Sequence, residues 1–412
     1  MEAQLKRKVV FVSNYINHHQ IPFCRAMCAR LGGSFAFIQT EPMEEERKSM
    51  GWGDVPPEEY LHLYYEAPKE CDALINNADI VLWGWTEKED YLQKRLAEKK
   101  PVIRVSERIY KEGQWKAISP RGLLKKYQDH TKYRNGPVYL LCSGAYVPSD
   151  FQIIHAYPKK MFAWGYFPET KAMDVEKLLA EKGHQMSDGT KVPSLLWTAR
   201  LIELKHPELA IETAQYLKSK GIPFHLNMIG GGAMEAQVKS WIRERGLEEE
   251  VSLLGFMKPA EVRACMEQAD VFLFTSDRRE GWGAVVNESM NSACVPVVGH
   301  MAGAAPYLIR HGENGFVYRD GDPQMLFKTV EKLLQDEALR KRLGKNAYQT
   351  IVGGWNAENA ALRLCRLIEE LTGLRLDDGA QASTAECVAR FLPCDPAPVI
   401  SERKMFRFLT EK

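Results

Sequence analysis

The sequence predicts an α/β protein whose two parallel-sheet domains face a central cleft. Short apolar runs alternate with helical patterns through both halves of the chain, as expected of parallel strands joined by helical crossovers. The alternation stops once, over the charged residues 166–192. The length of 412 residues also exceeds what one compact core usually holds. Two such domains joined once leave a cleft, a common place for a ligand.

The first half of the chain contains six apolar runs that are short enough to be buried strands. Helical patterns lie between several of them. The expected strands are residues 9–13, 34–39, 79–83, 102–105, 138–142 and 161–164, and the expected helices are 20–31, 87–99 and 148–156. Residues 1–165 are therefore expected to form a Rossmann-like N-terminal domain, with a linker at 166–192.

The alternation restarts after the linker and predicts a second Rossmann-like domain over residues 193–357. A further helix is expected at 359–371, and we expect residues 358–412 to be a helix and tail that pack back on the N-terminal domain. The expected strands are residues 194–198, 224–229, 251–254, 271–275 and 295–298, and the expected helices are 207–218 and 234–245.

The composition argues against several classes of protein. It is 45% hydrophobic and 26% charged, with a net charge of +1, which is ordinary for a soluble domain and unlike a general nucleic-acid binder. The nine cysteines form no Cys-x-x-Cys pair, so neither a zinc site nor a disulfide framework is indicated. No run approaches the roughly 20 apolar residues of a membrane span. A cytoplasmic location is expected.

Two carboxylates mark the strongest candidate site. Glu280 follows the apolar strand at 271–275 in a glycine-rich loop with Gly281, Trp282 and Gly283, and Glu288 comes about one turn into the next expected helix. Ligands of open α/β sheets bind at the carboxyl ends of strands. Two acids there can accept hydrogen bonds from several hydroxyls of a sugar or ribose.

Three other strand ends add complementary chemistry. Arg200 and Lys205 follow the strand at 194–198, and such cations suit a diphosphate. Gly230 and Gly231 open a glycine run that leads into a helix, where the backbone can approach an anion. Glu235 occupies the position where a dinucleotide fingerprint needs glycine. The last strand end carries Phe256 and Met257, whose main chain can contact a nucleobase.

Together these motifs resemble the nucleotide-sugar domain of the family 4 glycosyltransferases of GT-B fold, which are retaining enzymes. The resemblance covers roughly residues 193–350 and includes the run from His311 to Val317. It implies that Glu280 faces the transferred sugar, that Glu288 holds the ribose, and that Arg200 and Lys205 neutralise the leaving diphosphate. It also implies that no protein nucleophile is required. Because these two cations can neutralise the diphosphate, no metal ion is expected, and no cofactor is expected. The family's two-glycine loop before Pro-Glu is replaced here by Gly303-Ala304-Ala305-Pro306-Tyr307.

The first half resembles the family more weakly. Where many members place a histidine after a middle strand, this chain has Glu107, so Glu107, His18 or His19 is expected to serve near the acceptor. A salt bridge from Glu107 to Arg104 or Arg108 is the structural alternative. The run Trp83-Gly84-Trp85, at the end of a strand, is expected either to stack on a sugar ring or to pack at the edge of the core.

A basic stretch between Arg104 and Arg134 carries nine Lys or Arg residues against three acids, with aromatic residues interleaved. It is interpreted either as a solvated face or as a peripheral contact with the inner face of an anionic membrane. The pair Asp320 and Asp322 is interpreted as a turn and helix cap rather than a metal site.

These observations predict a retaining, metal-independent hexosyltransferase. It would move a sugar from a nucleotide-diphosphate-sugar donor to a hydroxyl of a glycan or lipid-linked acceptor, in cell-surface polysaccharide biosynthesis. No nucleic-acid partner is expected. A nucleotide-sugar epimerase of the same two-domain plan remains an alternative, because it would need the donor site but no acceptor. A non-catalytic sugar-binding module is a third.

Overall fold

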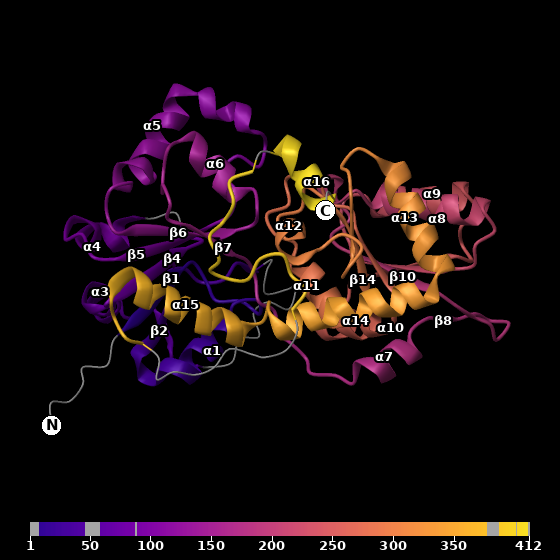
Figure 1. The fold of residues 1–412 in the computed structure, drawn as a ribbon, viewed down its shortest axis with the longest axis horizontal. Coiled ribbons are helices and arrows are strands. Elements are labelled where there is room, and N and C mark those ends of the chain that lie inside the picture. Colours follow the sequence, from indigo (N-terminus) through magenta and orange to yellow (C-terminus); the bar gives the residue numbers. More distant parts are fainter. Residues whose placement is uncertain (1–7, 46–57, 87–88, 377–386, 401, 411–412) are drawn as a thin grey trace. The chain divides into compact units, whose positions relative to one another are not determined.

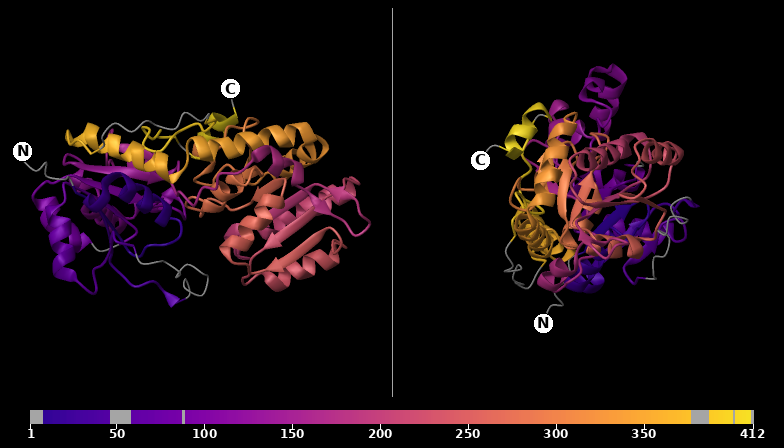
Figure 2. Two further views of the ribbon diagram at one scale, coloured as in Figure 1. Left: turned by 90° about the horizontal axis from the view of Figure 1, so that it is seen from below. Right: turned by 90° about the vertical axis from the view of Figure 1, so that its right-hand side faces the viewer.

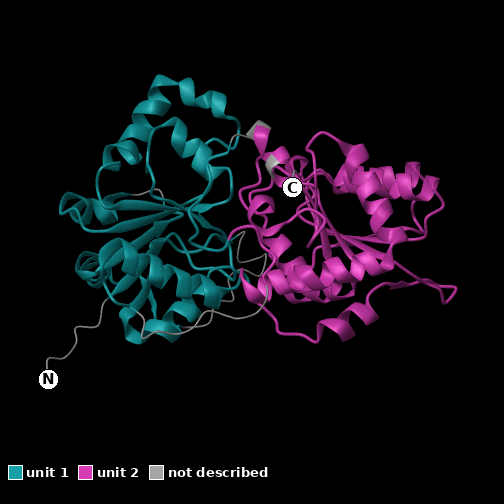
Figure 3. Ribbon diagram, in the orientation of Figure 1, with its two compact units in different colours: residues 1–169, 356–383, 392–400 teal, residues 170–355, 384–391, 401–412 magenta. Residues whose placement is uncertain are grey.

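The computed structural model describes residues 8–45, 58–86, 89–376, 387–400 and 402–410. The chain divides into two compact units (Figure 3). Unit 1 contains residues 1–169, 356–383 and 392–400, and unit 2 contains residues 170–355, 384–391 and 401–412. The backbone therefore passes between the units repeatedly rather than once, because the segments after residue 355 alternate between them.

Unit 1 is built on a parallel sheet of seven strands in the order β3-β2-β1-β4-β5-β6-β7 (Figure 1). Its central strands are apolar and buried, as expected of a parallel sheet covered on both faces. The strands are β1 (Val9–Ser13), β2 (Phe35–Gln39), β3 (Leu61–Leu63), β4 (Ile80–Gly84), β5 (Val102–Ser106), β6 (Val138–Ser143) and β7 (Met161–Trp164). The six expected strands are confirmed, and β3 is an additional short one.

Helices cover both faces of this sheet. On one face α1 (Ile21–Leu31) packs against β1, where the rings of Phe11 and Phe23 meet edge to face with centroids 6.3 Å apart, and α15 (Ala357–Thr372) packs on α1. On the other face α3 (Pro68–Asn77) and α6 (Val147–Ile153) share one buried cluster with the strands. The other helices in the described part of unit 1 are α4 (Gln93–Ala97) and α5 (Pro120–Asp129), with short 3-10 turns η1 (Gly32–Ser34), η2 (Glu89–Leu92), η3 (Gln114–Ile118) and η4 (Thr131–Tyr133).

Unit 2 repeats the plan with six parallel strands in the order β12-β11-β10-β13-β14-β15. Figure 2 shows its helices on both sides of the sheet. The strands are β10 (Ser194–Thr198), β11 (His225–Ile229), β12 (Val251–Gly255), β13 (Val271–Phe274), β14 (Val295–Gly299) and β15 (Phe316–Tyr318). The five strands expected here are confirmed, and β15 completes the sheet.

The main core of unit 2 lies between this sheet and three helices: α8 (Pro207–Ser219), α9 (Glu235–Glu244) and α13 (Pro323–Gln335). The other face is covered by α10 (Pro259–Gln268), α11 (Ala284–Asn291) and α14 (Glu337–Gly353). A four-residue helix, α12 (Ala305–Leu308), follows β14. Among the described residues, no helix combines the length and the low charge that crossing a bilayer demands.

The sequence predicts a linker over residues 166–192, but the structure folds most of this segment into unit 2. It forms α7 (Val175–Glu181), which packs on α14, and the hairpin of β8 (His184–Gln185) and β9 (Lys191–Val192). The charged composition misled the prediction because the charges of α7 face solvent, whereas Leu179 is buried against Ala293 and Tyr348.

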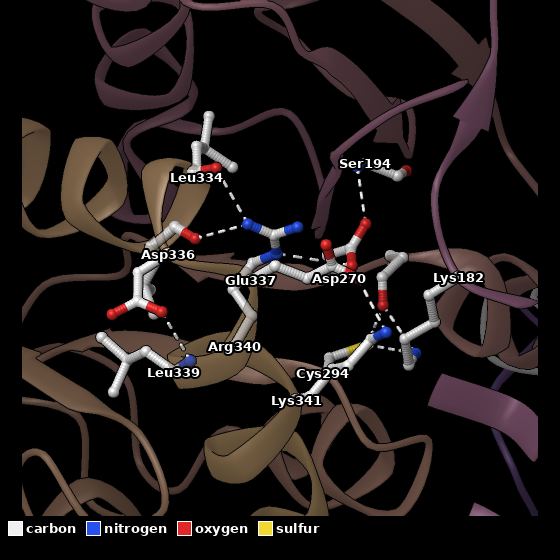
Figure 4. A network of polar contacts seen from close by, with 12 residues as sticks. Lys182, Ser194, Asp270, Cys294, Leu334, Asp336, Glu337, Leu339, Arg340 and Lys341 are labelled. Atoms are coloured by element: carbon white, nitrogen blue, oxygen red, sulfur yellow. Dashed lines mark hydrogen bonds and ion pairs between the residues drawn. The ribbon is translucent and has the colours of Figure 1, made fainter. Parts of the chain in front are cut away.

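Lys182 anchors this segment at the end of α10 (Figure 4). Its buried Nζ donates to the carbonyl oxygens of Met266 at 3.1 Å, Glu267 at 3.2 Å and Ala269 at 2.6 Å, and lies 3.9 Å from Cys294 Sγ. The last carbonyls of a helix have no intrahelical partner, and a cation there also suits the helix dipole. Lys182 thus caps α10 and holds residues 170–192 to unit 2.

Two further expectations need adjustment. The helix predicted at 87–99 appears as η2 followed by the short α4, and Glu87 and Lys88 lie outside the described residues. The tail does not stay with one domain. Helix α15 belongs to unit 1, whereas α16 (Glu402–Thr410) belongs to unit 2, where Met405 and Leu409 are buried.

Candidate donor site

The candidate site of unit 2 lies where the strand order reverses. The chain runs outward from β10 through β11 to β12, and then returns to place β13 on the other side of β10. The loops that leave β10 and β13 must therefore diverge, which opens a crevice at their carboxyl ends. Arg200 and Lys205 are on the first of these loops and Glu280 is on the second. The topology brings together residues that are 75 positions apart.

Lys205 and Glu280 form an ion pair in this crevice between the lysine Nζ and the carboxylate Oε2. Both side chains are largely sheltered, with exposed fractions of 15% and 16%. Two bonds fix the loops beneath them: Thr275 Oγ1 donates to the carbonyl oxygen of Lys205 at 2.6 Å, and the amide of Asp277 donates to the carbonyl oxygen of Leu204 at 3.0 Å. The pair is therefore held in place before any ligand arrives.

His206 gives these two loops another link. Its Nδ1 lies 2.5 Å from Glu208 Oε1 and its Nε2 lies 3.3 Å from Asp277 Oδ2. The hydrogen bond to Glu208, together with Asp277, raises the pKa of the His206 imidazole. Sequence reasoning missed His206 and Asp277, although both follow the ends of the adjacent strands β10 and β13.

Arg200 stands apart from this network. Its side chain is exposed, and it forms no ion pair with any residue that the structure describes. The backbone beside it is fixed, because the amide of Leu201 donates to the carbonyl oxygen of Gly231 at 2.9 Å. An exposed guanidinium on a fixed loop can take up a phosphate as a fork of donors.

Two of the three glycines after β11 are needed for close packing of the backbone, which the sequence analysis did not predict. Gly230 has φ +139°, and a Cβ there would lie 1.8 Å from the carbonyl oxygen of Ala199. Gly232 has φ +152°, with a Cβ 2.5 Å from the carbonyl oxygen of Leu201. Gly231 is different, because a Cβ there would meet only Glu235 Oε2, at 3.9 Å. Of these three glycines, only Gly231 has the open space that the predicted approach of a ligand requires.

Some residues of the loop between β13 and α11 lie at the candidate site, whereas others are buried in the core. Helix α11 begins at Ala284, as predicted, after Gly283 in the left-handed region. Trp282 was expected to contact the donor, but its side chain is 1% exposed and its Nε1 donates to Asn287 Oδ1 at 2.8 Å. The indole packs instead on Trp355, with ring centroids 5.2 Å apart. Gly281 is buried beside it.

The departures from the family's two-glycine loop are explained by the same aromatic cluster. Tyr307, in place of the acid, is fully buried and stacks on Trp355 with ring centroids 6.0 Å apart. The amide of Ala304 donates to the carbonyl oxygen of Trp282 at 3.1 Å. The carbonyl oxygen of Tyr307 accepts from the amide of Arg390 at 3.2 Å, so the chain around residue 390 covers this cluster.

Glu288 lies on α11, in the position expected of a ribose-binding acid. Its carboxyl forms no hydrogen bond with another residue in the described part of the chain. Loss of solvent around it raises its pKa from 4.5 to about 7, while the nearby Arg263 guanidinium opposes the rise. Arg263 is itself engaged, because it donates to the Glu288 carbonyl oxygen at 2.9 Å. A sheltered carboxyl without a partner is suited to ligand hydroxyls.

Phe256 and Met257 follow β12 at the edge of the sheet. Phe256 is 60% exposed, which is unusual for a phenylalanine, and it offers a flat apolar surface. Met257 is half-buried, and its Sδ lies 4.0 Å from Cys265 Sγ. The two residues therefore differ, and only Phe256 presents a broad face to solvent.

Asp322 caps α13 by accepting a hydrogen bond from the amide of Met325 at 3.0 Å, as predicted.

The residues that the sequence predicts near an acceptor lie in unit 1, after the carboxyl ends of its strands. His18 and His19 follow β1, and their rings lie 3.8 Å apart. Tyr166, after β7, connects the two predictions: its ring lies 5.9 Å from that of His19, and its hydroxyl donates to Glu107 Oε1 at 2.8 Å. Glu107 also pairs with Lys111 at 2.5 Å. The cations expected to bridge Glu107 have other partners, since Arg104 pairs with Glu89 and Arg108 with Asp150.

The protonation of the histidines follows from their burial. Desolvation lowers the pKa of His18 to about 4, and it lowers the pKa of His19 as well, with His18 adding to the effect. Both imidazoles are therefore neutral at pH 7. Sequence reasoning missed Tyr166. It lies two residues beyond a predicted strand, and a position after a strand is also what identified His18, His19 and Glu107.

A cavity of about 270 Å³ opens at the ends of β4 and β5 in unit 1. Its wall includes Trp85, whose ring lies 5.8 Å from that of Tyr166. Arg104 also lines the cavity. It pairs with Glu89, and its guanidinium carbon lies 4.2 Å from the centroid of the Trp83 ring. The remaining charged and polar wall residues include Lys125, Lys126, Asp129 and His130. The cavity thus combines indole surfaces with polar groups of both signs.

The comparisons with known proteins agree with this geometry. A family model described as Glycosyl transferases group 1 matches residues 185–350. The chain is 32% identical over 182 residues to the amylovoran biosynthesis glycosyltransferase AmsK of Erwinia amylovora, covering 43% of this chain and 44% of that protein. It is 31% identical over 137 residues to the putative colanic acid biosynthesis glycosyltransferase WcaL of Salmonella typhimurium, covering 32% and 34%. The chain spans less than half the length of these curated relatives.

Solved structures extend the likeness to the whole fold. Anabaena HepE in complex with UDP superposes with a TM-score of 0.62 at 16% identity, over 89% of this chain and 100% of that one. TarM gives a TM-score of 0.64 at 10% identity, over 91% and 100%. The match to the glycosyl transferases group 1 model covers residues 185–350, and the molecule has the GT-B fold that the motifs predict.

Proposed function

We propose that this protein transfers a hexosyl group from a nucleotide-diphosphate-sugar to a hydroxyl of a saccharide acceptor during assembly of a cell-surface polysaccharide. The observation that carries the proposal is the sheltered Lys205–Glu280 pair at the switch point of unit 2, on the same loops as the exposed Arg200. Relatives named for amylovoran and colanic acid biosynthesis support the polysaccharide context. The UDP in the HepE structure supports a nucleotide-linked donor.

In this proposal the donor exchanges partners with the ion pair. Its diphosphate takes up Arg200 and Lys205, whose charges stabilise the phosphate oxygens as the bond to the anomeric carbon breaks. Glu280, released from Lys205, accepts hydrogen bonds from hydroxyls of the sugar, and Glu288 accepts those of the ribose. Because lysine and arginine neutralise the leaving group, the mechanism that we propose requires no metal ion.

The acceptor is assigned to unit 1. Its hydroxyl oxygen bonds to the anomeric carbon on the face from which the diphosphate leaves, so the configuration is retained, and the hydroxyl proton passes to the departing phosphate oxygen. The neutral His18 or His19, or the Glu107 carboxylate held by Tyr166, is proposed as the group of unit 1 that orients this hydroxyl. The cavity beside Trp85 is proposed to hold the acceptor saccharide, because indoles stack on sugar rings and the polar wall can bind hydroxyls.

The first experiment identifies the donor, and the second tests the transfer reaction. UDP-, GDP- and ADP-sugars are compared by thermal shift, since a ligand of the native state raises the melting temperature. The stabilising donor is then incubated with oligosaccharide acceptors. The Glu280→Gln variant should lower the transfer rate by at least about a hundredfold with the melting temperature nearly unchanged. Glu337→Gln, at an exposed carboxylate of α14, serves as the matched control.

Three outcomes would contradict parts of the proposal. Near-normal transfer by Glu280→Gln would refute its role at the sugar. An isomerised donor without transfer would favour the epimerase instead. Donor binding without turnover against any acceptor would favour a binding module. NMR of the product's anomeric proton tests retention, and activity in EDTA tests independence from metal.

A further inference from the structure

The segment of residues 114–127 in unit 1 exposes an unusual set of side chains. Its helical part is almost unburied, since α5 buries none of its residues. Of the ten large hydrophobic side chains that are exposed in the described part of the chain, five lie in this segment: Trp115, Ile118, Leu123, Leu124 and Tyr127. Ile118 is 81% exposed. A soluble surface rarely gathers such residues without a partner.

The charges of the segment all have one sign. Lys116, Arg121, Lys125 and Lys126 are interleaved with the apolar residues, and no acid occurs between Gly113 and Gln128. Within α5, Leu124 and Tyr127 are three positions apart and therefore lie on one side of the helix. Helices that lie in a membrane interface have this pattern of Trp, Tyr and Leu flanked by Lys and Arg.

The segment is held firmly at both ends, so its exposure is a property of the folded unit. At its start, Gln114 Nε2 donates to Ser149 Oγ at 3.0 Å and to Asp150 Oδ1 at 2.9 Å. After its end, Thr131 Oγ1 donates to the carbonyl oxygen of Ile154 at 2.9 Å. Figure 1 shows α5 at the outer side of α6, away from the sheet of unit 1.

We propose that residues 114–127 dock unit 1 on an anionic lipid bilayer, with Trp115, Ile118, Leu124 and Tyr127 inserted among the headgroups. Anionic lipids complement four cations that have no acid among them, and the apolar side chains supply the burial that charge alone does not. The docking does not depend on the proposed enzyme activity.

One consequence does rest on the proposed function. Lys125, Lys126 and Asp129 of α5 line the cavity beside Trp85. A docked α5 therefore places that cavity at the lipid surface, where the headgroup saccharide of a lipid-linked acceptor would be found. The acceptor class inferred for this site is a saccharide carried on a membrane lipid.

Flotation with vesicles tests the docking with the full-length protein. The wild type should float with vesicles that contain about 30% phosphatidylglycerol, and at least about tenfold less with pure phosphatidylcholine or in high salt. Ile118→Ser/Leu124→Ser should abolish flotation, and Lys116→Gln/Arg121→Gln should weaken it. The matched control is Ile153→Ser/Val399→Ser, at two exposed apolar residues of unit 1 outside the segment, which should float like the wild type.

Nucleotide-sugar binding and melting temperature are measured for each variant, so that misfolding is distinguished from loss of docking. Failure of the wild type to float with anionic vesicles would overturn the proposal, as would equal loss in the control variant. A wild-type dimer that Ile118→Ser/Leu124→Ser converts to a monomer, without any flotation, would show that the segment binds a second copy instead. Failure of sugar transfer would leave this result unaffected.

Discussion

At the residue scale, the candidate donor site consists of charges that are arranged before the ligand binds. Lys205 and Glu280 satisfy one another, whereas Arg200 and the Glu288 carboxyl have no such partner in the described residues. A donor that supplies phosphate oxygens and hydroxyls would satisfy all four. Because the loops under the pair are already fixed, binding of such a donor would require the two side chains to change partners but would not require the loops to reorganise.

The raised pKa of Glu288 leads to a prediction about stability and pH. Because the folded-state pKa of about 7 exceeds the ordinary value of 4.5, the folded protein binds the extra proton between these values, and its stability falls as pH rises through them. Glu288→Gln, which cannot ionise, should therefore melt several degrees above the wild type at pH 8, at roughly 2–4 °C per kcal/mol. The difference should vanish near pH 4.5.

Melting curves across this range, from the ordinary pKa of 4.5 to above the folded-state value of about 7, measure the effect. A constant difference between the two proteins would contradict a titration at Glu288. Glu337→Gln again provides the control, because the pKa of this exposed carboxyl is lowered by its bond to Lys341 rather than raised.

At the scale of elements, the loops that follow β10 and β11 act as one unit. The amide of Ala199 donates to the carbonyl oxygen of Ile229 at 3.1 Å, and the amide of Met234 donates to that of Leu201 at 2.9 Å. Such close contact of two backbones is possible only without side chains at Gly230 and Gly232. The glycines therefore position Arg200 indirectly, through the loop that carries it.

Substitutions in the glycine run separate packing from ligand approach. Gly230→Ala should destabilise the protein by about 1–3 kcal/mol or more and weaken donor binding, because Ala199 must move. Gly231→Ala should leave the melting temperature nearly unchanged, since its Cβ meets only a flexible carboxylate at 3.9 Å. Melting and donor titration of both variants measure the two effects. Equal destabilisation by both would show that loop packing is not the cause.

At the scale of the whole molecule, the chain after residue 355 is shared between the two units. Residues 384–391 and 401–412 return to unit 2. There Trp355 Nε1 donates to the carbonyl oxygen of Phe391 at 2.7 Å, and the ring of Phe406 meets that of His300 with centroids 5.5 Å apart. Neither unit is therefore a continuous stretch of sequence.

The docking of α16 should be measurable as stability of unit 2. Met405 is fully buried, so Met405→Ala should cost about 2–5 kcal/mol and lower the melting temperature. Lys404→Ala, at the exposed neighbouring position, should change stability by less than about 0.5 kcal/mol. Thermal unfolding of the two variants provides the comparison. A loss for Lys404→Ala that matches Met405→Ala would indicate that the helix does not dock through Met405.

The sequence alone determined the alternating α/β plan and the positions of most strands, because buried parallel strands are short apolar runs that need no long-range information to be recognised. It also placed Arg200, Lys205, Glu280 and Glu288 at strand ends or the start of a helix, since those motifs are local. The role of Asp322 as a helix cap was equally local.

Only the tertiary structure decided which residues meet. The strand order made Lys205 and Glu280 neighbours, and it connected His19 to Glu107 through Tyr166. It also buried the Trp282 side chain against Trp355 and made residues 170–192 part of unit 2, because burial depends on which other segments pack against a residue. An indole in a glycine loop looks the same in sequence whether it faces a ligand or Trp355, and only the packing of distant residues distinguishes the two.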